Sequence, residues 1–302
     1  MLSLSTSWNS SKHTNGFDLI KEIKDIGFDT VELNFSLTKA MADDILSLKG
    51  RSEIKISSLH NICPLPDEIE PDEASPDYYS LASPDEEERR LAVEVTKNTI
   101  LYAKKFDAKA VILHTGRVQI KDKTKDLASS IDDENRYKAL KEEMMRERKK
   151  AEDGYLDNAI VSLEELTQYA KEMNVALAIE NRYYYREIPT SEELERIFKI
   201  FKKGSLFYWH DAVHAEVFER LGLVRHKDLL DKFSNRLLGV HLHDIIGPIN
   251  DHRPPGFGTF DFNLIKPYIK EDTIKVIEAH QPATADEICR SVEYLTKILD
   301  AR

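Results

Sequence analysis

Short apolar runs alternate with longer segments of helical period from one end of the chain to the other. Several of the runs are apolar at nearly every position, which is typical of parallel strands buried on both faces. We predict eight strands, which cover residues 2–8, 30–35, 55–60, 110–115, 175–180, 206–210, 237–244 and 275–280.

The segments between these runs place apolar side chains three or four positions apart, the spacing of one face of an α-helix. The pattern is clear over 15–26, 84–106 and 156–173. Ser83 and Pro84 predict the start of the second of these helices, as a cap followed by a proline in the first turn. Two capping boxes start further helices, and they pair Thr190 with Glu193 and Thr284 with Glu287.

Eight strands alternating with about eight helices are the content of a (β/α)8 barrel. We therefore predict an α/β fold with a single TIM-barrel domain over residues 1–302. An open doubly wound sheet is the alternative. Such a sheet usually carries a glycine-rich phosphate-binding turn after its first strand, whereas this chain has Ser-Trp-Asn-Ser-Ser there.

One connection is much longer than the others. Residues 117–155 separate the fourth strand from the helix that follows it, and they are rich in lysine, arginine, aspartate and glutamate. One interpretation is a charged helical insertion exposed to solvent. The other is a lid over the barrel mouth, or a contact between copies of the chain in a homo-oligomer, because long loops in compact folds are often functional.

The net charge of the chain limits the kinds of molecule that we expect it to bind. The chain has 43 Lys and Arg against 54 Asp and Glu, a formal net charge of −11, which disfavours non-specific binding to nucleic acids and to anionic membranes. Its two cysteines, Cys63 and Cys289, lie far apart, as in a reduced intracellular protein. We see no signal peptide and no apolar run near the ~20 residues of a membrane helix, and we expect a cytoplasmic protein.

Histidines and acids gather where the predicted strands end. In a β/α barrel the carboxyl ends of all strands meet at one mouth, where the chemistry is done. Two histidines lie in the loops after the sixth and seventh strands, His214 and His252. The residues at or near strand ends are His60, His114, Glu180, His210, Asp211, His241, His243, Asp244, Glu278 and His280.

Imidazole nitrogens and carboxylate oxygens together suit divalent ions such as zinc and manganese. His241 and His243 share one side of their strand, so one of them would bind an ion while the other supports the site. We expect His210 and His280 to be supporting or structural residues, and Glu32 to make only hydrogen bonds. Four arginines in mouth loops are either a solvated rim or anchors for a phosphate or carboxylate, namely Arg117, Arg182, Arg186 and Arg253.

An ordered set of short motifs on successive strands resembles the xylose isomerase-like TIM barrels, which include endonuclease IV and many sugar isomerases and epimerases. The likeness covers the chain except for the 117–155 segment. The motifs are LHN (59–61), ILHTG (112–116), AIEN (178–181), HDAVH (210–214), HLHD (241–244), NDHRPPGFG (250–258) and VIEAH (276–280).

The resemblance implies particular ligands. The family's epimerases hold one ion with residues that match Glu180, Asp211, His241 and Glu278, and His243 is the alternative to His241. Endonuclease IV adds a site that would use His60, His114 and Glu180. Its third site would use His214, an aspartate and His252, but Asn250 stands at the aspartate position here, and Asp251 is the open substitute.

The resemblance favours a metal-dependent isomerase or epimerase of a sugar, sugar phosphate or related polyol or keto compound. Glu180 and Glu278 would transfer protons next to a carbonyl group. The substrate would contact His214, His243, Arg182, Arg186 and Arg253, and the cofactor would be one to three zinc or manganese ions. Two alternatives stay open: a zinc-dependent phosphodiester hydrolase resembling endonuclease IV, and a metal-binding barrel without catalysis.

Overall fold

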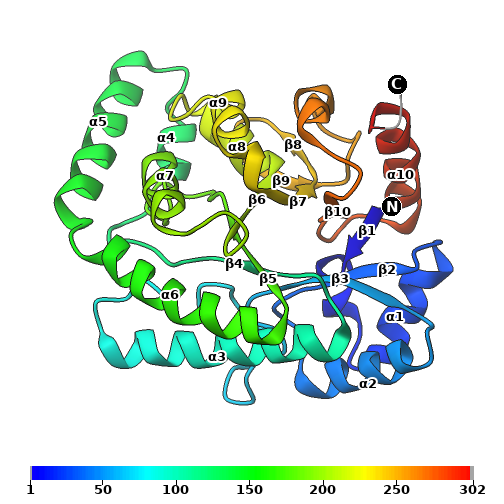
Figure 1. Ribbon diagram of the computed structural model, residues 1–302. Coiled ribbons are helices and arrows are strands. Elements are labelled where there is room, and N and C mark those ends of the chain that lie inside the picture. Colours follow the sequence, from blue (N-terminus) through cyan, green and yellow to red (C-terminus); the bar gives the residue numbers. More distant parts are fainter. Residues whose placement is uncertain (1, 300–302) are drawn as a thin grey trace.

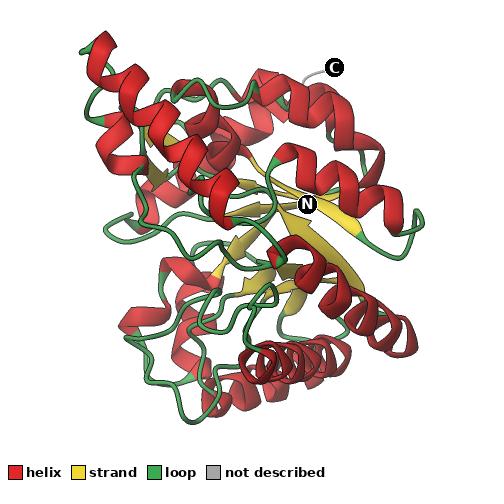
Figure 2. Ribbon diagram, turned by 90° about the vertical axis from the view of Figure 1, so that its left-hand side faces the viewer, coloured by secondary structure: helices red, strands yellow, loops and turns green. Residues whose placement is uncertain are grey.

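Eight parallel strands close into a barrel in the computed structural model, which describes residues 2–299 (Figures 1 and 2). Around the barrel the order is β1-β10-β7-β6-β5-β4-β3-β2. This confirms the predicted (β/α)8 fold. The barrel strands are β1 (Leu2–Ser5), β2 (Thr30–Leu33), β3 (Lys55–His60), β4 (Ala110–Leu113), β5 (Ala176–Glu180), β6 (Phe207–Asp211), β7 (Leu237–Leu242) and β10 (Ile274–Ile277).

Helices cover the outside of the barrel, as Figure 2 shows. They are α1 (Gly16–Asp25), α2 (Lys39–Gly50), α3 (Glu86–Phe106), α6 (Tyr155–Met173), α7 (Ser191–Ile200), α8 (Ala212–Arg220), α9 (His226–Phe233) and α10 (Ala285–Leu299). One expected alternation is absent from the described residues. Between β7 and β10 the chain forms an antiparallel hairpin, β8 (Asp244–Ile246) and β9 (Asn250–Arg253), followed by two 3₁₀ turns, and no α-helix.

The start of α3 differs from the prediction. Asp85, and not Ser83, is the N-cap, and its carboxylate accepts hydrogen bonds from the backbone N–H groups of Glu87 and Glu88. Ser83 instead donates its hydroxyl to Glu88 over 2.7 Å. The physical reason is that a carboxylate is as good an N-cap as a hydroxyl and also complements the positive end of the helix dipole.

The charged segment after β4 forms two helices, α4 (Thr124–Ala128) and α5 (Glu134–Ala151). In Figure 1, α5 runs along the side of the barrel near α4 and α7. Arg148 fixes it there, because its buried guanidinium donates to the carbonyl groups of Tyr185 and Glu187 and to the carboxylate of Glu193. The segment is therefore anchored to the connection between β5 and α7.

Side chains fill the barrel interior below the mouth. Trp209 on β6 is fully buried there, and a Cβ atom on Gly239 of β7 would lie 2.2 Å from its indole ring. Glycine is therefore required at this position by the close approach of the ring. With the interior closed, polar chemistry is confined to the carboxyl ends of the strands. Among the described residues no helix is long and apolar enough to cross a membrane.

Candidate metal centre and active site

Four buried residues at the carboxyl ends of four strands converge at the floor of the mouth. One ligand atom from each of them lies within 4.8 Å of those of the other three. The imidazole Nδ1 of His241 lies 2.5 Å from Glu180 and 3.0 Å from Glu278. This is the first predicted ligand set, and its members are Glu180, Asp211, His241 and Glu278.

The charge of this group fits a divalent cation. Glu180, Asp211 and Glu278 are all nearly inaccessible to solvent, and the ion pairs of these carboxylates within residues 2–299 involve histidine and no lysine or arginine. Burial raises the pKa of Glu278 to about 8. Burial also opposes ionisation of Glu180, but His241 and His114 hold the pKa of Glu180 well below its usual value. A bound dication would stabilise both carboxylates in their ionised form.

Glu32 of β2 supports this group from below. Its carboxylate lies 3.1 Å from Nε2 of His241 and accepts a 2.7 Å hydrogen bond from the hydroxyl of Ser58. The hydrogen bonds agree with the expectation for Glu32, and its contact with His241 is in addition an ion pair when the imidazole is protonated. A carboxylate on the far nitrogen of an imidazole ligand orients the ring and raises its basicity.

A second group shares Glu180 with the first and contains His60 and His114. Nε2 of His114 lies 2.7 Å from the Glu180 carboxylate, and Nε2 of His60 lies 3.5 Å from it. On its other side, Nδ1 of His114 lies 3.2 Å from Asp77, a residue of the acidic loop after β3. The sequence prediction missed Asp77, because a single aspartate among many in that loop carries no local signal.

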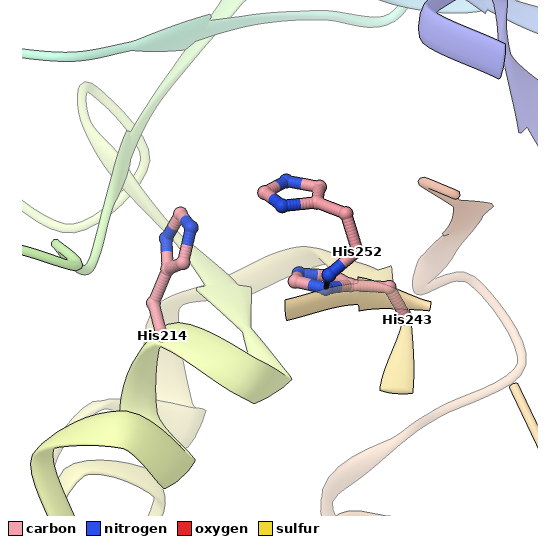
Figure 3. Close-up of side chains that lie close together, drawn as sticks. All are labelled: His214, His243 and His252. Carbon is pink, nitrogen blue, oxygen red and sulfur yellow. Dashed lines mark hydrogen bonds between the residues drawn. The ribbon is translucent and has the colours of Figure 1, made fainter. Parts of the chain in front are cut away.

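The third group consists of three histidines, His214, His243 and His252 (Figure 3). They come from α8, the end of β7 and the hairpin strand β9, and the rings of His243 and His252 stack with centroids 4.3 Å apart. Among the described residues Asp251, the open substitute for the aspartate of the resemblance, does not belong to the group, and its carboxylate lies 2.9 Å from Nδ1 of His252. The third member of the group is His243.

The electrostatics of the three histidines differ. Burial lowers the pKa of His214 to about 4, so its ring is neutral at pH 7. Burial also opposes a charge on His252, but Asp251 raises the pKa of His252 to about 9. His252 also has φ of 53°, in the left-handed region that side chains other than glycine rarely adopt. Such a conformation persists only where surrounding contacts impose it.

The two histidines expected to be supporting lie in different places. His280 stacks on His252 with ring centroids 3.8 Å apart and lines the mouth. His210 lies fully buried behind the site, where Nδ1 is 2.8 Å from the hydroxyl of Tyr208 and Nε2 is 2.9 Å from His226. His210 is therefore structural, whereas His280 can contact a ligand.

The three groups border one cavity of about 620 Å³, within the size range of small-ligand sites. The cationic side chains on its wall are Arg117, Lys125, Arg182 and Arg186. The aromatic residues Phe35, Tyr183 and Tyr184 also line it, and sequence reasoning did not select them. Arg253, predicted to bind substrate, lies outside this cavity and lines an adjoining depression with His280 and Glu287.

Comparisons with known proteins agree with this architecture. A family model described as a xylose isomerase-like TIM barrel matches residues 20–298. The uncharacterized protein MJ1614 of Methanocaldococcus jannaschii is 24% identical over 264 residues, which cover 86% of this chain and 83% of that protein.

Solved structures share the fold over nearly the full length. A D-tagatose 3-epimerase-like protein matches with a TM-score of 0.70 at 19% identity, covering 99% of this chain and 97% of that one. The 3-keto-D-glucoside 4-epimerase of E. coli matches with a TM-score of 0.68 at 14% sequence identity, covering 98% of both chains. The IOLI protein, solved with a zinc atom, matches at 0.67 and 15%, covering 99% and 98%. The matched family model spans nearly the whole barrel, and this chain belongs to the xylose isomerase-like TIM barrel family.

Proposed function

We propose that this protein is a metal-dependent isomerase or epimerase of a small carbohydrate. The observation that carries the proposal is the buried group of Glu180, Asp211, His241 and Glu278 at the floor of a cavity of about 620 Å³. The carboxylates of Glu180 and Glu278 stand at the ends of different strands, β5 and β10, so they would reach a bound molecule from different directions. The names of the solved relatives, one an epimerase and one an epimerase-like protein, support the same reaction class.

The four residues would hold one divalent ion, zinc or manganese. Such an ion supplies Lewis acidity, which stabilises negative charge developing on a carbonyl oxygen and its neighbouring hydroxyl. Glu180, held ionised by His114 and His241, is suited to remove the proton from the carbon next to the carbonyl. Glu278, whose carboxylate also borders the cavity, would return a proton to the adjacent carbon or to the opposite face. His214, with a neutral ring, would bind a substrate oxygen.

Solvent-deuterium exchange into candidate ketoses, followed by NMR, tests the proposal. We expect metal-loaded protein to exchange the proton next to the carbonyl, and Glu180→Gln and Glu278→Gln each to lower the rate at least 100-fold, the usual contribution of a general acid or base. Glu172→Gln, on the exposed face of α6, is the matched control and should exchange normally. Exchange that survives in both active-site variants would exclude this mechanism.

Phosphodiester hydrolysis is the second candidate, and the three neighbouring donor groups favour it. Clustered ions stabilise both the attacking and the leaving oxygen in such reactions. The acidic loop after β3 opposes it, because its carboxylates would repel a nucleic-acid backbone. Metal-dependent cleavage of an abasic-site oligonucleotide, lost in His60→Ala and His114→Ala, would put hydrolysis first.

A further inference from the structure

The wall of the cavity formed by the connections after β4 and β5 carries an excess of unpaired positive charge. Every carboxylate on the cavity wall has an imidazole or guanidinium partner within 4.0 Å, and these carboxylates are Asp77, Glu180, Glu187, Asp251 and Glu278. In contrast, Arg117, Lys125 and Arg186 have no ion pair among the residues that the structure describes. One side of the cavity therefore carries cationic side chains that have no carboxylate partner among the described residues.

Arg182 lies at the centre of this wall and is only 4% exposed. Its Nη2 donates to Asp77 over 2.7 Å and to Glu187 over 2.8 Å, which fixes the plane of the guanidinium. Its Nε and Nη1 are buried and have no hydrogen-bond partner in the described structure. A buried donor without an acceptor is costly, so an acceptor absent from the described residues is the simplest account, and Arg182 borders the cavity.

Arg186 shows the same feature. Its Nε is buried without a hydrogen-bond partner among residues 2–299, and within the same residues Nη1 makes only a long 3.5 Å contact with the carbonyl of Ile120. Arg117 lies on the neighbouring connection, where its backbone pairs with that of Glu187. Three arginines from two adjacent connections thus line one side of the cavity, and two of them, Arg182 and Arg186, carry buried donors without a hydrogen-bond partner among the described residues.

We propose that Arg117, Arg182 and Arg186 form a subsite for an anionic group of the substrate, a phosphate or a carboxylate. Guanidinium groups bind both in a bidentate manner, because their planar forks match the spacing of two oxygens. A continuous set of contacts leads from the metal centre to this subsite, through Glu180, His114 and Asp77 to Arg182. A substrate that binds the metal centre with its carbonyl end would therefore place a terminal anion here.

This inference rests on the proposed function, since it adds an anionic group to the proposed carbohydrate. The test is calorimetric binding to the metal-loaded protein of D-fructose, D-fructose 6-phosphate, D-fructuronate and inorganic phosphate. We expect one sugar anion to bind at least about tenfold more tightly than D-fructose, because a charge-assisted hydrogen bond contributes about 1.5–3 kcal/mol. A preference for the phosphate or for the uronate identifies which anion the subsite takes.

The variants Arg117→Gln and Arg186→Gln should each weaken binding of the preferred anion about tenfold and leave D-fructose unaffected. Both side chains are partly exposed, and Arg182 is left intact because it holds two buried carboxylates. Arg90→Gln, on the exposed side of α3, removes the same charge at a distance and should have no effect. Metal content is measured in each variant, so that anion binding to the ion itself is held constant.

The inference is wrong if no anion binds more tightly than D-fructose, or if Arg90→Gln weakens binding as much as the two cavity variants. Arginine-dependent anion binding without deuterium exchange would support the subsite and count against the isomerase. Exchange into neutral ketoses, with no preference for anions, would support the isomerase and exclude the subsite.

Discussion

The protonation state of His241 affects whether this residue can bind a metal ion. Burial disfavours a charged imidazole here, but the carboxylates of Glu278, Glu32 and Glu180 surround the ring and raise the pKa of His241 well above its usual value. A raised pKa means that, without a bound ion, the ring carries its extra proton at pH 7. A metal ligand must offer a free nitrogen, so an ion can bind His241 only by displacing that proton.

We therefore predict that metal binding at pH 7 releases protons and that affinity increases with pH. Calorimetric titration of the metal-free protein with zinc, in two buffers of different ionisation enthalpy, should show at least about one proton released per ion. His241→Gln should reduce the release, whereas His13→Gln, at the surface beside Glu22, should not. Equal heats in both buffers would contradict the assignment of His241 as a ligand.

Among single residues, the sequence identified most of the histidines and carboxylates that line the mouth, because strand ends can be found from the pattern. It did not identify Asp77 or Glu187. Asp77 reaches Arg182 across 105 positions of the chain, so no local pattern records the pairing. It also placed Arg253 with the other arginines, since the sequence does not show that β9 directs this side chain into an adjoining depression.

Among the secondary-structure elements, α5 of the 117–155 segment stabilises the loop that carries Arg182 and Arg186. Arg148 of α5 is buried, and it bonds to two carbonyl groups of the 182–190 connection and to Glu193 at the start of α7. Glu193 also completes the capping box with Thr190, which confirms that prediction from the sequence. One side chain thus connects the insertion, the cavity wall and the start of a helix.

Replacing Arg148 by methionine should destabilise this part of the molecule. Removing one partner of a buried ion pair typically costs about 3–5 kcal/mol, because the other charge is left uncompensated. We expect the free energy of unfolding, measured by urea denaturation, to fall by about 3 kcal/mol. Amide hydrogen exchange should become faster over residues 117–155 and 182–190. Arg146 is an exposed residue of the same helix, α5. The control variant Arg146→Met should change the free energy of unfolding by no more than about 0.5 kcal/mol. Unchanged exchange in Arg148→Met would show that the insertion is held by other contacts.

At the scale of the whole molecule, the barrel brings together carboxylates that repel one another. Glu32, Glu180, Asp211 and Glu278 come from β2, β5, β6 and the end of β10, and all are buried. The fold accepts this concentration of charge because histidines separate the carboxylates, and a bound dication would neutralise more of it. Metal binding and global stability should therefore be coupled.

Removing the metal with a chelator should lower the thermal unfolding midpoint. At a free-ion concentration a thousand times Kd, linkage stabilises the folded state by about 4 kcal/mol, which corresponds to several degrees for a chain of this size. Differential scanning calorimetry would measure the shift. Glu278→Gln should abolish most of it, whereas Glu271→Gln, before β10 at the opposite end of the barrel, should retain it. Identical midpoints with and without metal would contradict the proposed centre.

The eight-stranded barrel and the position of its histidines and carboxylates at one end follow from the amino-acid pattern alone. Alternation of apolar runs with helical segments is a local property, and the convergence of parallel strand ends is a rule of the fold. Together they place the histidines and carboxylates of the strand ends at one mouth, and the resemblance to the family then selects Glu180, Asp211, His241 and Glu278 among them as one ligand set.

The pairing of side chains within that mouth, in contrast, depends on the three-dimensional path of the chain. The contact of His243 with His252, the exclusion of Asp251 from the histidine group, and the buried donors of Arg182 all depend on the path of loops and hairpins. Loop paths are set by long-range packing and hydrogen bonds and carry no periodic signal. The hairpin that replaces a helix after β7, and the anchoring of α5 by Arg148, were decided in the same way.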